Sequence, residues 1–178
     1  MLRKRNDFEI IEALRKGPKH IRHISEATGI IPSTVTRTMR RLEEEGAVDF
    51  IHEGKNKIYS LKQTPEGQLY LYMTEHYKLL KLLQDAQLRR IARQLQEHTS
   101  GELIMLFGSH AKGTANSKSD IDIFVETDDR ALKTRLSSLS EKLGIKIGKL
   151  QKENPLTQEI IKHHVIIQNT ERFYRATR

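Results

Sequence analysis

Apolar residues recur at helical spacing through the first third of the chain, and turn-forming residues interrupt them. A first helix is expected to begin at Asn6 and to end before Gly17, and a second should cover Ile21 to Thr28, because glycine follows each where a helix stops. A third helix should begin at Pro32, since proline suits the first helical turn. The pattern therefore predicts three short helices on one core. The apolar positions facing that core are Phe8, Ile11, Leu14, Ile24, Val35, Met39 and Leu42.

Two segments of strand-like composition follow the third helix. Ala47–Ile51 and Lys57–Leu61 are joined by the short, glycine-containing connection His52–Asn56, as a β-hairpin requires. Three helices and a hairpin with a basic tip resemble the winged helix-turn-helix domain of bacterial and archaeal transcriptional regulators, over about residues 6–65. The resemblance implies binding of double-stranded DNA, with the third helix in the major groove.

The third helix carries a polar face opposite its apolar one. Hydroxyl and guanidinium groups on that face suit phosphates and base edges, and lysines at the hairpin add positive charge. The alternative is a winged helix that serves only protein contacts. The candidate DNA-binding residues are Ser33, Thr34, Thr36, Arg37, Arg40 and Arg41, with Lys55 and Lys57 on the hairpin.

Residues 66–98 contain no proline and only one glycine, Gly67, so they are expected to be helical. The apolar register shifts at residues 84–87, which predicts either two helices or one bent helix. The first apolar stripe comprises Leu69, Tyr72, Met73, Leu79, Leu80 and Leu83, and the second comprises Leu88, Ile91, Ala92 and Leu95. The first stripe fits two interpretations: the contact surface of a homodimer on a two-fold DNA site, or packing on the chain's own domains.

Candidate chemistry is concentrated after the apolar run Leu103–Phe107. A Gly108-Ser109 turn comes directly after that run, and Asp120 and Asp122 introduce the next one. Residues i and i+2 of a strand point to the same face, so the two carboxylates should lie side by side. Their repulsion is relieved by a divalent cation such as Mg²⁺, which takes carboxylate oxygens and bridges phosphates. The turn offers backbone N–H groups and a hydroxyl to the same phosphates.

This arrangement resembles the nucleotidyltransferase superfamily that includes DNA polymerase beta, and most closely its minimal branch. The matching residues are Gly108, Ser109, Ala111, Gly113, Ser119, Asp120 and Asp122, within a resemblance over about residues 90–175. The resemblance implies ATP or another nucleoside triphosphate, with two metal ions assisting displacement at the α-phosphorus. It implies that Asp120 and Asp122 hold Mg²⁺ and form the catalytic set with Ser109. It also implies that Gly108, Ser109 and Lys112 bind the triphosphate.

Active members of that superfamily also need a third carboxylate on a later strand. The corresponding strand is expected at Ile145–Leu150, which contains neither aspartate nor glutamate and offers Lys146, Gly148 or Lys149. Glu153, just beyond this strand, and Glu102, just before the first strand of the domain, are the acids that could replace it. The missing acid casts more doubt on nucleotidyl transfer than on nucleotide binding.

Composition adds limits on class. The chain has 178 residues, a formal charge of +8, which suits a polyanionic partner, and no cysteine. No apolar stretch approaches the roughly 20 residues that span a bilayer, so a cytoplasmic protein without a membrane partner is expected. Strands and helices alternate after residue 99, with a helix expected from about Asp129 to Leu143 ahead of the strand Ile145–Leu150. The predicted fold is a two-domain α+β arrangement: a winged helix-turn-helix domain (1–65), a helical connector (66–98), and a nucleotidyltransferase-like mixed sheet with flanking helices (99–178).

Two functions from different classes remain open. The first is a DNA-binding transcriptional regulator whose C-terminal domain binds Mg-nucleotide and transfers it weakly or not at all. The second is an active nucleotidyltransferase whose acceptor is a nucleic acid or a protein, such as the toxin-like partner of an antitoxin. The lack of an aspartate or glutamate in Ile145–Leu150 is the sequence feature that distinguishes the two functions.

Overall fold

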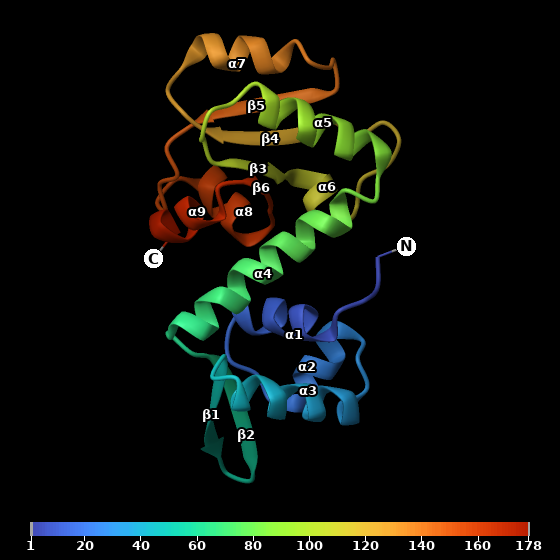
Figure 1. Cartoon of the computed structure of the whole chain (residues 1–178), viewed down its shortest axis with the longest axis vertical. Helices are drawn as coiled ribbons and strands as arrows, with labels where there is room; N and C mark the ends of the chain where they lie inside the picture. Colours follow the sequence, from blue (N-terminus) through green and yellow to red (C-terminus); the bar gives the residue numbers. More distant parts are fainter. Residues whose placement is uncertain (1, 178) are drawn as a thin grey trace. The chain divides into compact units, whose positions relative to one another are not determined.

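The computed structural model describes residues 2–177 (Figure 1). The chain forms two compact units, of which the first ends at Tyr77 and the second begins at Lys78. Within the described residues, no helix has both the length and the apolar character needed to cross a membrane.

The first unit has the three helices and the hairpin that the sequence predicts. Buried apolar side chains from all three helices meet in one core with residues of the hairpin. The two strands are antiparallel, from Val48 opposite Leu61 to Glu53 opposite Asn56, and Gly54 takes a left-handed conformation in the turn. The elements are α1 (Asn6–Arg15), α2 (Ile21–Thr28), α3 (Pro32–Glu44), β1 (Val48–Glu53) and β2 (Asn56–Leu61).

The connector consists of two helices, α4 (Pro65–Leu82) and α5 (Ala86–Glu97). Asp85 caps α5 by accepting a hydrogen bond from the backbone N–H of Leu88 at 2.9 Å, so the shift in apolar register marks a break between helices. The stripe on α4 is divided. Tyr70 and Leu71 pack on the core of the first unit, while Leu79, Leu82 and Leu83 pack on that of the second. Leu69, Met73 and Leu80 remain exposed.

A four-stranded mixed sheet forms the centre of the second unit, with the strand order β5-β4-β3-β6. Strand β3 is antiparallel to both β4 and β6, and β4 is parallel to β5. This confirms the predicted mixed sheet with flanking helices. In chain order the elements are β3 (Ile104–Phe107), α6 (Gly108–Lys112), β4 (Ile121–Glu126), α7 (Arg130–Ser137), β5 (Leu143–Gly148), α8 (Pro155–Lys162), β6 (Val165–Gln168) and α9 (Thr170–Thr177).

Helices cover both faces of this sheet (Figure 1). Alternate residues of the strands, such as Ile123 and Ile145, face a core shared with α5 and α7. The residues between them, such as Phe124, face a second core that Ile160 of α8 and Phe173 of α9 complete. The strands are therefore apolar on both faces along most of their length, and a polar residue within them stands out.

Two boundaries differ from the sequence prediction. A helix was expected from Asp129 to Leu143, but α7 ends at Ser137, and the following strand begins at Leu143 rather than at Ile145. The parallel pairing explains the shift, because Leu143 lies opposite Ile121 at the start of β4. The residues between α7 and β5 must return the chain to that end of the sheet.

Candidate functional site

The turn between β3 and α6 brings the backbone against a carboxylate of the neighbouring strand. Gly108 has a φ of +69°, and a Cβ atom added to it would lie only 2.4 Å from Oδ2 of Asp122. Any larger residue would clash there and would also be strained in the left-handed region. The register explains the approach, because Asp122 lies opposite Phe107, the residue that immediately precedes this turn. The structure thus brings together the turn and the aspartate that the sequence assigned to one site.

Asp120 immediately precedes β4, and Asp122 is the second residue of that strand; Asp120 is exposed and Asp122 is partly buried. Burial raises the pKa of Asp122 and the negative charge of Asp120 raises it further, while Lys146 and His110 act in the opposite direction. Two adjacent acids are therefore electrostatically unfavourable as a pair of anions, which is the situation that a divalent cation relieves. Across residues 2–177, no cluster of three or more His, Cys, Asp or Glu side chains is arranged to hold a metal.

Strand β5 provides glycine and lysine next to these acids. Gly144 lies opposite Asp122, and a Cβ atom there would be 3.0 Å from Oδ1 of the aspartate. Two residues further along, and therefore on the same face of the sheet, stands the exposed Lys146, opposite Phe124. The strand that should carry a third acid thus presents an ammonium group beside the pair.

The remaining predicted residues of the site have different surroundings. Ser109 is partly buried in the first turn of α6. Lys112, at the end of that helix, forms an ion pair with Glu159 of α8, with 2.5 Å between Nζ and Oε1. The hydrogen bond from Lys112 holds the pKa of the Glu159 carboxyl below its usual value. The ammonium assigned to phosphate binding therefore already has a carboxylate partner on another helix.

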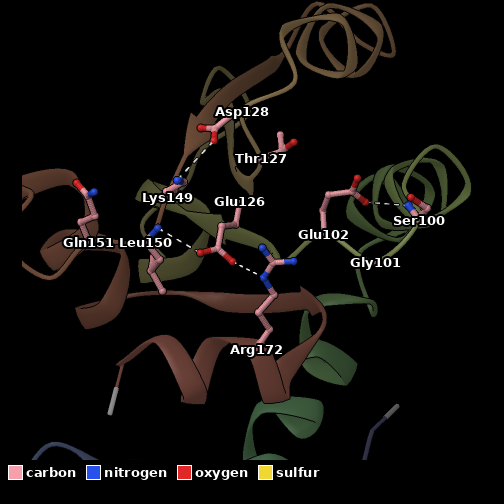
Figure 2. Close-up of a pocket in the computed structure, with 10 residues that line it drawn as sticks. All are labelled: Ser100, Gly101, Glu102, Glu126, Thr127, Asp128, Lys149, Leu150, Gln151 and Arg172. Atoms are coloured by element: carbon pink, nitrogen blue, oxygen red, sulfur yellow. Dashed lines mark hydrogen bonds and ion pairs between the residues drawn. The ribbon is translucent and has the colours of Figure 1, made fainter.

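Glu102, one of the two possible replacement acids, lies far from Asp122. It lines a hollow of about 750 Å³ together with Glu126, which ends the strand that Asp122 begins (Figure 2). Four residues along a strand span about 13 Å. Glu102 accepts a hydrogen bond from the backbone N–H of Ser100. It is therefore not placed to complete the metal site.

Four of the charges in this hollow form two ion pairs, as Figure 2 shows. Arg172 of α9 donates to Glu126, with 2.5 Å between Nε and Oε2, and Lys149 lies 3.9 Å from Asp128. Glu126 also accepts a hydrogen bond from the backbone N–H of Leu150. The contact between Arg172 and Glu126 attaches α9 to the sheet.

The candidate DNA-binding face lies on α3. Ser33, Thr36, Arg37 and Arg40 are exposed, and Thr34 is partly exposed, while the opposite side of the helix is buried in the core. These are the side chains of the predicted recognition helix, and the structure leaves them accessible.

Arg41 has a separate environment. Its guanidinium donates to Oδ2 of Asp7 at 3.1 Å, and the same carboxylate binds Arg5 at 3.0 Å. Asp7 is only 5% exposed, so these contacts link α1 to α3. A DNA contact by Arg41 stays a prediction, but its guanidinium already holds two helices together.

The hairpin presents Lys55 and Lys57 to solvent. The ammonium of Lys57 lies 3.5 Å from the centre of the Phe50 ring, a cation–π contact that fixes its position. On the opposite face of the hairpin, Ile51 is 70% exposed, an unusual place for a large aliphatic side chain. The alternating pattern of the strand marked Ile51 only as apolar, so its exposure could not be read from the sequence.

His110 was not among the site residues predicted from the sequence. It is partly buried, its charge acts on Asp122, and its Nε2 atom is buried without a hydrogen-bond partner among residues 2–177. His110 therefore belongs to the surroundings of the aspartates. Its position directly after Ser109 in the turn was the only signal of this in the sequence.

Comparisons with known proteins assign both parts of the chain. A family model of winged helix-turn-helix DNA-binding domains matches residues 3–49, and a family model of nucleotidyltransferase domains matches residues 87–176. No curated protein sequence matches the chain.

Solved structures show weak similarity. The transcriptional regulator BldR from Sulfolobus solfataricus is 20% identical, with 53% of this chain and 73% of that chain covered and a TM-score of 0.38. The transcriptional repressor BigR from Xylella fastidiosa is 20% identical. The match covers 38% of this chain and 67% of that chain, with a TM-score of 0.36. A toxin-antitoxin structure with AMP-PNP is 24% identical. The match covers 56% of this chain and 77% of that chain, with a TM-score of 0.34. The assignment therefore depends on the two family matches. The nucleotidyltransferase family model matches half of the chain, so the chain belongs to the nucleotidyltransferase domain family. It carries a winged helix-turn-helix domain ahead of that domain.

Proposed function

We propose that this protein is a DNA-binding transcriptional regulator whose nucleotidyltransferase domain binds a Mg-nucleoside triphosphate and transfers it poorly or not at all. The close approach of Gly108 to Asp122 carries the nucleotide part of the proposal. With the turn this close to Asp122, one bound Mg-triphosphate could contact both the backbone N–H groups of the turn and the two acids.

Each residue has a defined task in this proposal. Asp120 and Asp122 hold Mg²⁺, which would neutralise the phosphate charge when bound. Ser109 and the backbone at Gly108 bind phosphate oxygens through N–H and O–H donors. Lys112 can contribute only by leaving Glu159, so its contribution is expected to be small. The lack of a third acid on β5 leaves no carboxylate there to activate an acceptor hydroxyl.

Calorimetry with ATP, GTP, CTP and UTP, each with and without Mg²⁺, tests the binding. We expect heat with at least one triphosphate in the presence of Mg²⁺, and its loss in Asp122→Ala. A matched control is Asp128→Ala, which removes an exposed carboxylate of the same domain at the other end of β4. Absence of heat for every nucleotide would contradict this part of the proposal.

The DNA-binding part relies on the exposed polar face of α3. Binding to a pool of random-sequence duplexes, measured at several salt concentrations, should weaken in the double variant Arg37→Ala, Arg40→Ala. Each lost phosphate contact should reduce the salt slope by about one. The variant Arg130→Ala, Lys133→Ala removes the same charge from α7 and serves as the control. An unchanged slope in the α3 variant would exclude this helix as the DNA-binding element.

We also propose a homodimer formed through α4. The support is the exposure of Leu69 and Met73, one turn apart on this helix, at 57% and 41%. Analytical ultracentrifugation should detect a dimer that the double variant Leu69→Glu, Met73→Glu converts to a monomer. A monomeric wild-type protein at high concentration would reject this proposal.

Membership of the nucleotidyltransferase domain family favours a second candidate function, which is transfer to a protein or nucleic-acid acceptor. Incubation with labelled ATP and Mg²⁺, alone and with a candidate acceptor such as a toxin-like partner protein, distinguishes the two. Transfer that disappears in Asp120→Ala would establish the enzyme. Nucleotide binding without transfer would support the regulator.

A further inference from the structure

We propose that the ammonium group of Lys146 takes the place of a second divalent cation, so that the site binds one metal ion with each nucleotide. The inference rests on the proposed nucleotide site at Asp120 and Asp122. It concerns a residue of this chain that departs from the family pattern, and it determines how many ions the site can hold.

The register of the sheet places Lys146 beside the two acids. Strands β4 and β5 are parallel, with Asp122 opposite Gly144 and Phe124 opposite Lys146. Strand spacing and rise put the Cα atoms of Asp122 and Lys146 about 8 Å apart on a diagonal. An extended lysine side chain covers most of that distance. Because Gly144 has no side chain, nothing on β5 stands between the ammonium and the carboxylate.

Lys146 has no competing partner among residues 2–177. Lys112 is bound to Glu159 and Lys149 lies near Asp128, but Lys146 forms no ion pair or hydrogen bond through its side chain. It is one of the two positive groups that act on Asp122, and the other is His110. Its charge is therefore available to the acids and to a bound phosphate.

A lysine at this position has two consequences for metal binding. A protonated ammonium has three donors and no acceptor, so it cannot be a metal ligand. Its positive charge also repels a second cation while it attracts the oxygens that such a cation would bridge. One divalent ion held by Asp120 and Asp122, together with one ammonium, is the combination that these side chains allow.

The alternative is a solvated lysine on an edge strand that leaves metal binding unchanged, and counting ions separates the two. The protein is dialysed to equilibrium against Mn²⁺ and a nonhydrolysable ATP analogue, and retained ion and nucleotide are both measured. We expect one Mn²⁺ per retained nucleotide for the wild type. Lys146→Asp supplies a third carboxylate and should raise the ratio to two. The control Lys133→Asp makes the same charge change on α7, which covers the other face of the sheet, and should leave the ratio at one.

A second variant tests the repulsion directly. Without nucleotide, Lys146→Ala should bind Mn²⁺ about six-fold more tightly than the wild type, because a unit charge about 8 Å from a divalent ion is removed from an exposed site. Electron paramagnetic resonance of free Mn²⁺ gives this affinity. Lys146 is exposed, so both variants should keep the wild-type circular dichroism spectrum.

The outcomes distinguish this inference from the proposed function. If the wild type retains no nucleotide, the proposed nucleotide site is wrong. If it retains nucleotide with two Mn²⁺ ions, or if Lys146→Asp retains only one, the site exists and the role of Lys146 is refuted. An unchanged Mn²⁺ affinity in Lys146→Ala would refute the role as well.

Discussion

Alanine substitutions at three glycines can test whether the turn and Asp122 form one site. Gly108 and Gly113 both have left-handed backbone angles, with φ of +69° and +72°. A Cβ at Gly108 would lie 2.4 Å from Oδ2 of Asp122, whereas a Cβ at Gly113 would meet nothing within 4 Å. The two variants therefore share the backbone strain, and only one of them displaces the carboxylate. Gly144→Ala is intermediate, at 3.0 Å from Oδ1 and without strain.

The magnitudes follow from these distances. The left-handed conformation costs a non-glycine residue about 1–2 kcal/mol, so both Gly108→Ala and Gly113→Ala should lower the free energy of unfolding by that amount. Ordinary contact requires about 3.4 Å, so Gly108→Ala must also push the Asp122 carboxylate away by about 1 Å. Displacing a metal ligand through its neighbours costs about 10–100-fold in metal affinity. Gly144→Ala should lose less, because its carboxylate moves by only about 0.4 Å.

Thermal unfolding and calorimetry with a Mg-triphosphate measure the two effects separately. At roughly 2–4 °C per kcal/mol for a chain of this size, the two left-handed variants should melt at similarly reduced temperatures. Nucleotide affinity should fall in the order Gly113→Ala, Gly144→Ala, Gly108→Ala, with Gly113→Ala close to the wild type. Equal losses of affinity in Gly108→Ala and Gly113→Ala would refute the contact as the source of binding.

Two further predictions concern buried ion pairs. Burial raises the pKa of Asp7, but hydrogen bonds and charge from Arg5, with help from Arg41, lower it more, so the pKa of this carboxyl lies below its usual value. Asp7→Asn should cost about 2 kcal/mol at neutral pH. Urea titrations should show this difference closing as the pH falls through the lowered pKa, because the wild-type carboxylate then becomes protonated, and a constant difference down to pH 2 would contradict the reasoning. Arg172→Ala should lower stability by about 1–2 kcal/mol, since Glu126 loses its partner, yet leave nucleotide binding unchanged in calorimetry. A loss of nucleotide binding would show that the hollow belongs to the site.

Local signals in the sequence were sufficient for most of the first unit. The helix α2 ends where glycine was expected, and Gly29 takes the left-handed conformation that this position requires. The break between α4 and α5 was visible as a change of apolar register, and Asp85 supplies the cap. In each case a few neighbouring residues determine where the helix stops, so the sequence alone was informative.

The end of α7 and the start of β5 could not be predicted in the same way. Leu136, Leu139 and Leu143 continue a helical spacing, which favours one long helix. The structure ends the helix at Ser137 because Leu143 pairs with Ile121, a residue 22 positions earlier. Parallel pairing depends on such distant partners, and no local pattern records it.

The sequence also could not predict which basic side chains form ion pairs within the protein. Lys112 binds Glu159 and Arg41 binds Asp7, contacts between residues 47 and 34 positions apart. Residue type and spacing made both cations candidates for phosphate, and only the fold shows that each has a carboxylate partner. The same limit applies to Lys146. The strand that carries it could be predicted, but the lack of a carboxylate partner for its ammonium group among residues 2–177 could not.

A regulator built from a DNA-binding domain and a nucleotide-binding domain responds to nucleotide only if the two binding events are coupled. By linkage, a nucleotide that changes the affinity for DNA by some factor must have its own affinity changed by the same factor when DNA is bound. Regulation therefore requires reversible binding, because a nucleotide transferred to an acceptor in each cycle would not report its concentration at equilibrium. The proposed site, with one metal ion, a lysine in place of the third acid and no carboxylate on β5, would meet that requirement. The departure of this chain from the family pattern thus favours a sensor over a catalyst.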